Sequence, residues 1–272
     1  MRVNEETEIE KTRSSGNGEG EAQPEGEREM SFLDHLEELR WRLIKALIGL
    51  LFAVLACGVF SDWIVNEVVL RPGAVISPPL KLINTIPYGQ ITFYMMVVIV
   101  AGLIVSSPWI LYQLWKFVQP GLLPSERKYI SGIVTYTTLC FLAGVAFAYF
   151  VILPYMLQFF ATFGTSGIQN MISVSEYMSF VLQLILLSGL IFELPMVSYF
   201  LARLGILTPA FMRHYRRHAI VVILIVAAVV TPTTDPFTMA VFSIPMLVLY
   251  EISIWIAGIA RSKREAAGTA TE

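Results

Sequence analysis

Six long apolar runs constrain the fold of this chain more than any other feature of its sequence. They cover residues 43–60, 91–114, 130–153, 177–201, 219–231 and 237–260. A helix needs about 20 mostly apolar residues to cross the hydrocarbon core of a bilayer. Four runs exceed that length, and the first, with 18 residues, lies at the short end of the usual range. We therefore predict an all-α polytopic membrane protein with six transmembrane helices.

The fifth run, residues 219–231, is the shortest. Its thirteen residues rise about 20 Å along a helix, which is less than a hydrocarbon core of about 30 Å. Such a run forms either a re-entrant segment or a short span in a locally thinned bilayer. The connection after it, residues 231–236, is too polar for the membrane centre, so we predict a short span.

The distribution of Lys and Arg predicts the orientation. Thirteen of these residues lie at the ends of the runs on one side, and only Arg71 and Lys81 lie on the other. Cytoplasmic connections carry the excess of Lys and Arg. We therefore expect both termini in the cytoplasm (N-in/C-in), which requires an even number of spans and supports counting the fifth run as a crossing.

The two ends of the chain differ from the apolar region. Residues 1–30 contain nine Glu against four Lys or Arg and almost no bulky apolar side chain, so we expect a disordered acidic cytoplasmic tail rather than a signal peptide. Residues 31–261 form the predicted six-span membrane domain, and residues 262–272 a cytoplasmic C-terminal tail.

The predicted outer connections are distinctive. Residues 61–90 hold four prolines among short apolar pieces and predict an ordered cap of short helices or turns, whereas residues 154–175 carry no Lys or Arg. Tyr and Trp gather at membrane interfaces. On this basis we assign several aromatic side chains to the outer interface (Trp63, Tyr88, Tyr94, Tyr155 and Tyr177) and two to the inner one (Trp115 and Tyr129).

Residues 31–43, immediately before the first span, predict an amphipathic helix. Phe32, Leu36, Leu39 and Leu43 fall on one stripe, and the opposite side is charged. Such a helix lies at a membrane surface with its charged side in water. Alternatively, the charges serve only the helix itself, for instance through i,i+4 pairing of carboxylate and guanidinium.

One ionisable residue, Glu193, lies deep in the fourth run. It precedes Arg203 by ten residues, about 15 Å along a helix. Burial of a carboxylate at this depth costs several kcal/mol unless it is protonated, paired or hydrated, so such residues are usually functional. Pro195 has no N–H for the Ile191 carbonyl and predicts a kink beside the carboxyl. The alternative is a neutral Glu193 bonded to Ile191; Glu251 is a weaker candidate.

The second connection holds a further carboxylate, Glu126. Ser125 can cap the third span with Glu126 in its first turn, which alone would explain both residues. The predicted topology, however, places Glu126 on the same membrane face as Glu38. Two carboxylates there suit a ligand with two guanidinium groups, because each carboxylate accepts a bidentate contact.

Catalytic and metal-binding patterns are missing from the sequence. Its three histidines, His35, His214 and His218, lie outside the apolar runs, and the serines within the runs have no nearby His to activate them. We therefore expect no enzymatic activity, no metal and no cofactor. The net charge of −2 gives no indication of a nucleic-acid partner.

Six motifs resemble those of one family, TatC, the multi-span component of the twin-arginine (Sec-independent) protein translocase. They are HLEELRWRL at 35–43, SSPWILYQLWKFVQPGLLPSER at 106–127, AFAYFVILP at 146–154, FELP at 192–195, VTP followed by Asp235, and SIPMLVLYEI at 243–252. The motifs occur in order from residue 31 to about residue 261. Only the acidic tail lies outside this region.

The resemblance implies a specific function. TatC proteins have six spans in a concave wall, with short last spans, in the bacterial plasma (inner) membrane. They bind the twin-arginine signal peptides of folded cargo and, in oligomeric complexes with TatA- and TatB-type single-span proteins, help to transport that cargo with the proton-motive force. They are not enzymes.

The family's functional positions match individual residues of this chain. Its signal-contacting carboxylates match Glu38 and Glu126, with Arg40 in the same motif and the aromatic Phe117 beside the signal site. Its intramembrane carboxyl matches Glu193. The chain departs from the family at Leu123 and Pro124, where an aromatic and a polar residue are usual.

Two other classes of protein are alternatives. A proton-coupled secondary transporter would use Glu193 as its coupling site near a broken helix, but it should show internal repeats, and the sequence has none. An intramembrane hydrolase would need an activated nucleophile.

Overall fold

The structure is a computed structural model that describes residues 32–119, 130–163, 171–230 and 236–269. The chain divides into two units, residues 1–38 and residues 39–272. Only residues 32–38 of the first unit are described. Helix α2, Phe32–Val59, begins in the first unit and continues into the second, which contains every other described element.

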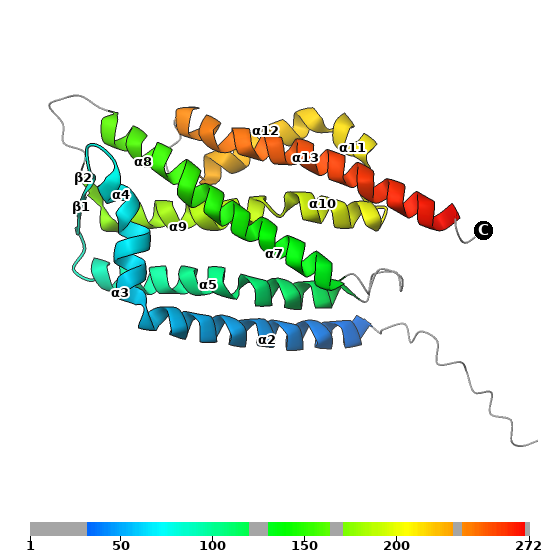
Figure 1. The fold of residues 1–272 in the computed structure, drawn as a ribbon, viewed down its shortest axis with the longest axis horizontal. Helices are drawn as coiled ribbons and strands as arrows, with labels where there is room; N and C mark the ends of the chain where they lie inside the picture. Colours follow the sequence, from blue (N-terminus) through cyan, green and yellow to red (C-terminus); the bar gives the residue numbers. More distant parts are fainter. Residues whose placement is uncertain (1–31, 120–129, 164–170, 231–235, 270–272) are drawn as a thin grey trace, which may run out of the picture. The chain divides into compact units, whose positions relative to one another are not determined.

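Among the residues that the structure describes, five helices are long and apolar enough to cross a membrane, which confirms the predicted all-α polytopic class. They cover Leu33–Val59, Gly89–Val118, Ser131–Thr162, Val174–Arg203 and Thr238–Ser262. The corresponding elements are α2, α5 (Gly89–Val118), α7 to α8, α9 to α10, and α13 (Pro236–Thr269) (Figure 1). The predicted fifth span forms α12, Arg216–Val230. Its 15 residues are fewer than the 18 required of a helix that could span a membrane. Its crossing of the membrane, and with it the count of six spans, stays a prediction.

The third span extends further than predicted. Helix α7 (Ile130–Phe147) continues through a π-helical turn, η3 (Ala148–Ile152), into α8 (Leu153–Thr162). The prediction that a connection begins at residue 154 was therefore wrong. Pro154 lies in the first turn of α8, where its missing N–H and its ring are tolerated after the wider turn.

The connection over residues 61–90 is ordered, as predicted. It contains α3 (Ser61–Trp63), π-helical η1 (Ile64–Leu70), α4 (Arg71–Val75) and strand β1 (Lys81–Ile83). Strand β1 pairs in parallel with β2 (Met171–Ser173), with Leu82 opposite Ile172. This pairing joins the connection before α5 to the one before α9, and nothing local in the sequence indicates it.

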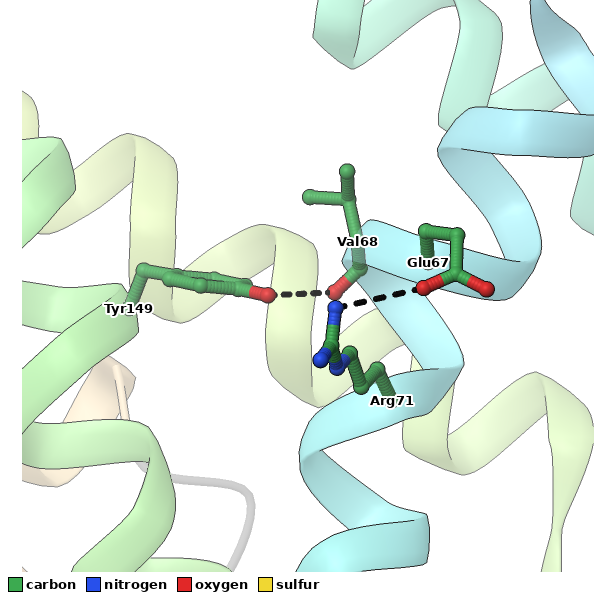
Figure 2. Close-up of polar contacts among 4 residues, drawn as sticks. All are labelled: Glu67, Val68, Arg71 and Tyr149. Carbon is green, nitrogen blue, oxygen red and sulfur yellow. Dashed lines mark hydrogen bonds and ion pairs between the residues drawn. The ribbon is translucent and has the colours of Figure 1, made fainter.

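Two tyrosine hydroxyls join η1 to η3 and α9. Tyr149 Oη donates to the carbonyl of Val68 at 2.9 Å, as Figure 2 shows. Tyr177 Oη, on α9 (Val174–Ile191), donates to the next carbonyl, that of Val69, at 2.7 Å. Tyr177 is only 2% exposed, so its assignment to the outer interface was wrong. The hydroxyl that suggested a position near water instead serves a buried backbone carbonyl.

Small residues allow α5 to approach α2 closely. The indole Nε1 of Trp109 donates to the carbonyl of Lys45 at 2.9 Å. The ring lies over Gly49, where a Cβ atom would be 2.3 Å from Trp109 Cδ1. Further along, a Cβ on Gly102 would lie 2.5 Å from Val54 Cγ2. The contact between these helices therefore requires a residue without a side chain at both glycines.

The largest core cluster lies where α9 packs against α5, α7 and η3. It includes fully buried side chains of several elements, among them Val97, Ala148, Leu153 and Val181. Within the most apolar 18-residue stretch of each span, 50% of the residues of Val174–Arg203 are buried, but only 6% of those of Leu33–Val59. The fourth span is therefore the central helix of the second unit, and it holds Glu193.

Candidate functional site

Two of the predicted signal-contacting residues lie on α2. Glu38 is half-buried and Arg40 is exposed, and both take part in polar or electrostatic interactions. Glu38 is the last residue of the first unit and Arg40 belongs to the second. The predicted helix from residue 31 is confirmed from Phe32 onward, where it is continuous with the first span.

The other two predicted signal-contacting residues are Phe117, at the end of α5, and Glu126, in the connection after it. Phe117 is half-buried in the last turn of this helix. Glu126, with Leu123 and Pro124, lies in residues 120–129, outside the described residues. The predicted pairing of Glu38 with Glu126 therefore stays a prediction.

Glu193 lies at a break in the fourth span, as predicted. Helix α9 ends at Ile191 and α10, Leu194–Arg203, begins with Pro195 in its first turn. The Glu193 N–H donates to the Leu190 carbonyl at 3.1 Å, and the Glu193 carbonyl accepts from the Val197 N–H at 2.9 Å. One tight turn therefore joins α9 to α10 at the point where Pro195 cannot donate a backbone hydrogen bond. The Glu193 carboxyl projects from that turn.

The Glu193 carboxyl is buried against α7. The residue is 9% exposed, and its Oε1 has no hydrogen-bond partner among the described residues. The carboxyl lies beside Cys140 and the backbone of Phe141. No described hydrogen bond joins it to Ile191, so the structure does not support the purely local alternative.

Close packing of α7 and α9 holds the break in place. Ser188 Oγ donates to the Gly144 carbonyl at 3.0 Å. A Cβ atom on Gly144 would lie 2.6 Å from the Ser188 carbonyl oxygen. The rings of Phe147 and Phe192 pack in a tilted arrangement at 5.5 Å between centroids. The carboxyl therefore lies where α7 and α9 approach each other closely and are joined by a hydrogen bond.

Two further buried polar atoms, which no pattern in the sequence indicates, lie on α5 and α7. Trp115 Nε1 on α5 and Thr138 Oγ1 on α7 have no hydrogen-bond partner among the described residues. Trp115 is 6% exposed and packs edge-on against Phe200 of α10, at 5.0 Å between centroids. Its assignment to the inner interface was wrong, because an indole beside a helix end can face a neighbouring helix as readily as the headgroups.

The remaining ionisable candidates have other partners or exposed positions. Glu251 accepts a 2.8 Å hydrogen bond from Arg216, so its charge is matched. His214 and His218 are exposed on either side of Tyr215, whose ring contacts both. Among the described residues, no group of three or more His, Cys, Asp or Glu could hold a metal ion.

Comparison with known proteins gives a consistent family. Residues 34–245 match the family model described as Sec-independent protein translocase protein (TatC). The chain is 36% identical over 237 residues to the TatC protein of Koribacter versatilis, covering 86% of this chain and 87% of that protein. It is 39% identical over 224 residues to the TatC protein of Helicobacter pylori, covering 82% and 85% of the two chains.

A solved structure agrees with these sequence relatives. The structure of a protein described as the twin arginine translocase receptor TatC superimposes with a TM-score of 0.75 at 34% identity, over 83% of this chain and 99% of that one. The resemblance inferred from the six motifs is thereby confirmed. With its apolar helices and its buried carboxyl at a broken span, the chain belongs to the TatC family of Sec-independent protein translocase membrane components.

Proposed function

We propose that this chain is the receptor component of a twin-arginine translocase and binds the signal peptides of folded cargo proteins. The observation that supports this most strongly is its similarity, over 83% of its length, to a structure described as a twin arginine translocase receptor. The motifs around Glu38 and Phe117 lie within the matched region, residues 34–245.

In the proposed site, Glu38 and Glu126 each accept a bidentate contact from one arginine of the signal peptide. Phe117 supplies an apolar surface beside the arginines. Arg40, in the same motif as Glu38, is the fourth residue of the proposed site. The two guanidinium groups of a twin-arginine peptide match two carboxylates in both charge and geometry.

Glu193 has a separate proposed role within the membrane. Its buried Oε1 lacks a partner among the described residues, and burial of a carboxyl at this depth is costly. We place there the contact with a polar side chain of a TatA- or TatB-type single-span protein. Transport of folded cargo through the resulting oligomeric complex is driven by the proton-motive force.

The proposed location is the bacterial plasma membrane, with six spans and both termini in the cytoplasm. Thirteen Lys and Arg residues against two support this orientation. α12 is then a short crossing.

A direct test is a pull-down of the detergent-solubilised full chain with an immobilised twin-Arg signal peptide. A twin-Lys peptide is the matched control, because it keeps the charge but cannot make planar bidentate contacts. We expect the twin-Arg peptide to retain the chain and the twin-Lys peptide to retain clearly less. Equal retention by both would contradict the proposed recognition.

A further inference from the structure

The connection between α10 and α12 forms a compact, well-anchored element. Gly205 reverses the chain with a positive φ of 78°, and Thr208 Oγ1 then caps α11 (Pro209–His214) by accepting from the Phe211 N–H at 3.2 Å. Tyr250 Oη of α13 donates to the Met212 carbonyl at 2.8 Å. Met212 belongs to a small core with Ala202 and α13. The turn that follows α11 is therefore held at a defined position.

This turn and the two helix ends that flank it, together the Arg213–His218 turn, present an unusual concentration of basic groups. Residues 213–218, with the sequence RHYRRH, are all exposed. Arg216 is already paired with Glu251 at 2.8 Å. Within the described part of the chain, Arg213 and Arg217 have no carboxylate partner. Two guanidinium groups thus remain available for an anion, with two imidazoles next to them.

Apolar side chains begin directly after the basic residues. On α12, Ile220, Val221, Val222 and Ile225 are 37–57% exposed. On α11, Phe211 is 54% exposed. In a membrane protein such exposed apolar faces contact lipid chains. Val221 follows Arg217 by four residues, a rise of about 6 Å, so the guanidinium groups lie at the boundary between the hydrocarbon and water.

We propose that the Arg213–His218 turn binds the headgroup of an anionic phospholipid whose acyl chains lie along the exposed apolar face of α12. Guanidinium groups bind phosphate through paired, charge-assisted hydrogen bonds. A free phosphate ion would leave the apolar face without a role, whereas a phospholipid fits both the charged turn and the adjacent side chains. The inference requires only that the protein spans a membrane and is independent of signal-peptide binding.

The charge sets the size of the expected effect. A Lys or Arg near an anionic membrane surface contributes about a fivefold preference, so loss of both unpaired arginines should lower the preference roughly 25-fold. Because the site is exposed, added salt should weaken it.

The test uses the full chain in bilayers of equal amounts of phosphatidylglycerol and phosphatidylcholine with identical acyl chains. The protein is extracted in mild detergent, and the lipids it retains are counted by native mass spectrometry. We expect the wild type to retain phosphatidylglycerol preferentially and R213Q/R217Q to lose most of that preference. R213K/R217K keeps the charges and should retain most of it.

The matched control, R71Q/K81Q, also removes two positive charges, but from the segment that holds α4 and β1. It should leave the preference unchanged. Equal preference in R213Q/R217Q and the wild type would overturn the proposal, as would an equal loss in the control. If R213Q/R217Q does not fold, the wild type remains decisive: a phosphatidylglycerol preference that rising NaCl leaves unchanged would also overturn it.

Discussion

The contact between Trp109 and Gly49 gives a quantitative prediction about how the first two spans are held together. In Gly49→Ala, the new Cβ would lie 2.3 Å from Trp109 Cδ1 and 2.6 Å from Nε1. Carbon atoms in contact prefer about 3.5–4.0 Å, so the indole must move by more than about 1 Å. That movement would break its 2.9 Å hydrogen bond to the Lys45 carbonyl.

Three free-energy changes combine in this substitution. Overpacking a fitted contact costs about 1–3 kcal/mol. The lost hydrogen bond costs about 0.5–1.5 kcal/mol. Against these, Ala in place of Gly within a helix stabilises by about 1 kcal/mol. We therefore expect Gly49→Ala to lower the free energy of unfolding by about 0.5–3.5 kcal/mol in total.

A second glycine on the same helix is the control. A Cβ on Gly58 would meet only Val98 Cγ1 at 3.8 Å, an ordinary contact, so Gly58→Ala should be neutral or stabilising. Unfolding can be followed by circular dichroism in mixed micelles as SDS is increased.

A double-mutant cycle isolates the coupling between the two residues. Trp109→Phe removes the N–H and shrinks the ring, so the double variant with Gly49→Ala should be more stable than the sum of the single effects by about 1 kcal/mol or more. If Gly49→Ala and Gly58→Ala unfold at the same SDS fraction, or if the cycle shows no coupling, the proposed close contact is wrong.

Three further predictions concern other parts of the chain. Glu193→Gln keeps the shape and hydrogen-bonding capacity of the side chain and should retain more transport activity than Glu193→Ala at equal levels of inserted protein; full transport by both would remove the proposed partner contact. Tyr177→Phe removes the hydroxyl that serves the Val69 carbonyl and should lower the free energy of unfolding by about 1–3 kcal/mol, because a buried carbonyl loses its donor; an unchanged unfolding midpoint would refute this. In a chain lacking Cys57 and Cys140, Ser77→Cys should react with an impermeant thiol reagent from outside the cell and Ala210→Cys should not; the reverse pattern would invert the proposed orientation.

Local chemistry explains what the sequence could predict. Long apolar runs need no knowledge of tertiary partners to indicate spans, and all but the shortest run correspond to helices long enough to cross. The break at Glu193 was equally predictable, because Pro195 removes a specific backbone donor. The amphipathic start of α2 follows from its 3.6-residue periodicity.

The errors arose where distant parts of the chain decide the outcome. Tyr177 and Trp115 lie near span ends, as interface aromatics do, but each faces a neighbouring element rather than the headgroups. Pro154 marks a boundary in most helices, and only the π-helical turn before it lets this helix continue. The partner of Glu251 lies 35 residues earlier in the chain, a separation that no local pattern reveals.

The most direct test of the central claim is site-specific cross-linking of a twin-Arg signal peptide to the wild type and to Glu38→Gln, Glu126→Gln and the double variant. Hydrogen bonds to charged groups contribute about 1.5–3 kcal/mol each, and less where the carboxylate is exposed. Each single substitution should therefore weaken peptide binding by about tenfold at low salt. Glu37→Gln, which changes the neighbouring carboxylate on α2, is the control and should bind like the wild type. Unchanged cross-linking in all of these variants, with the fold intact, would show that the two carboxylates serve only their helices and that the signal peptide binds elsewhere.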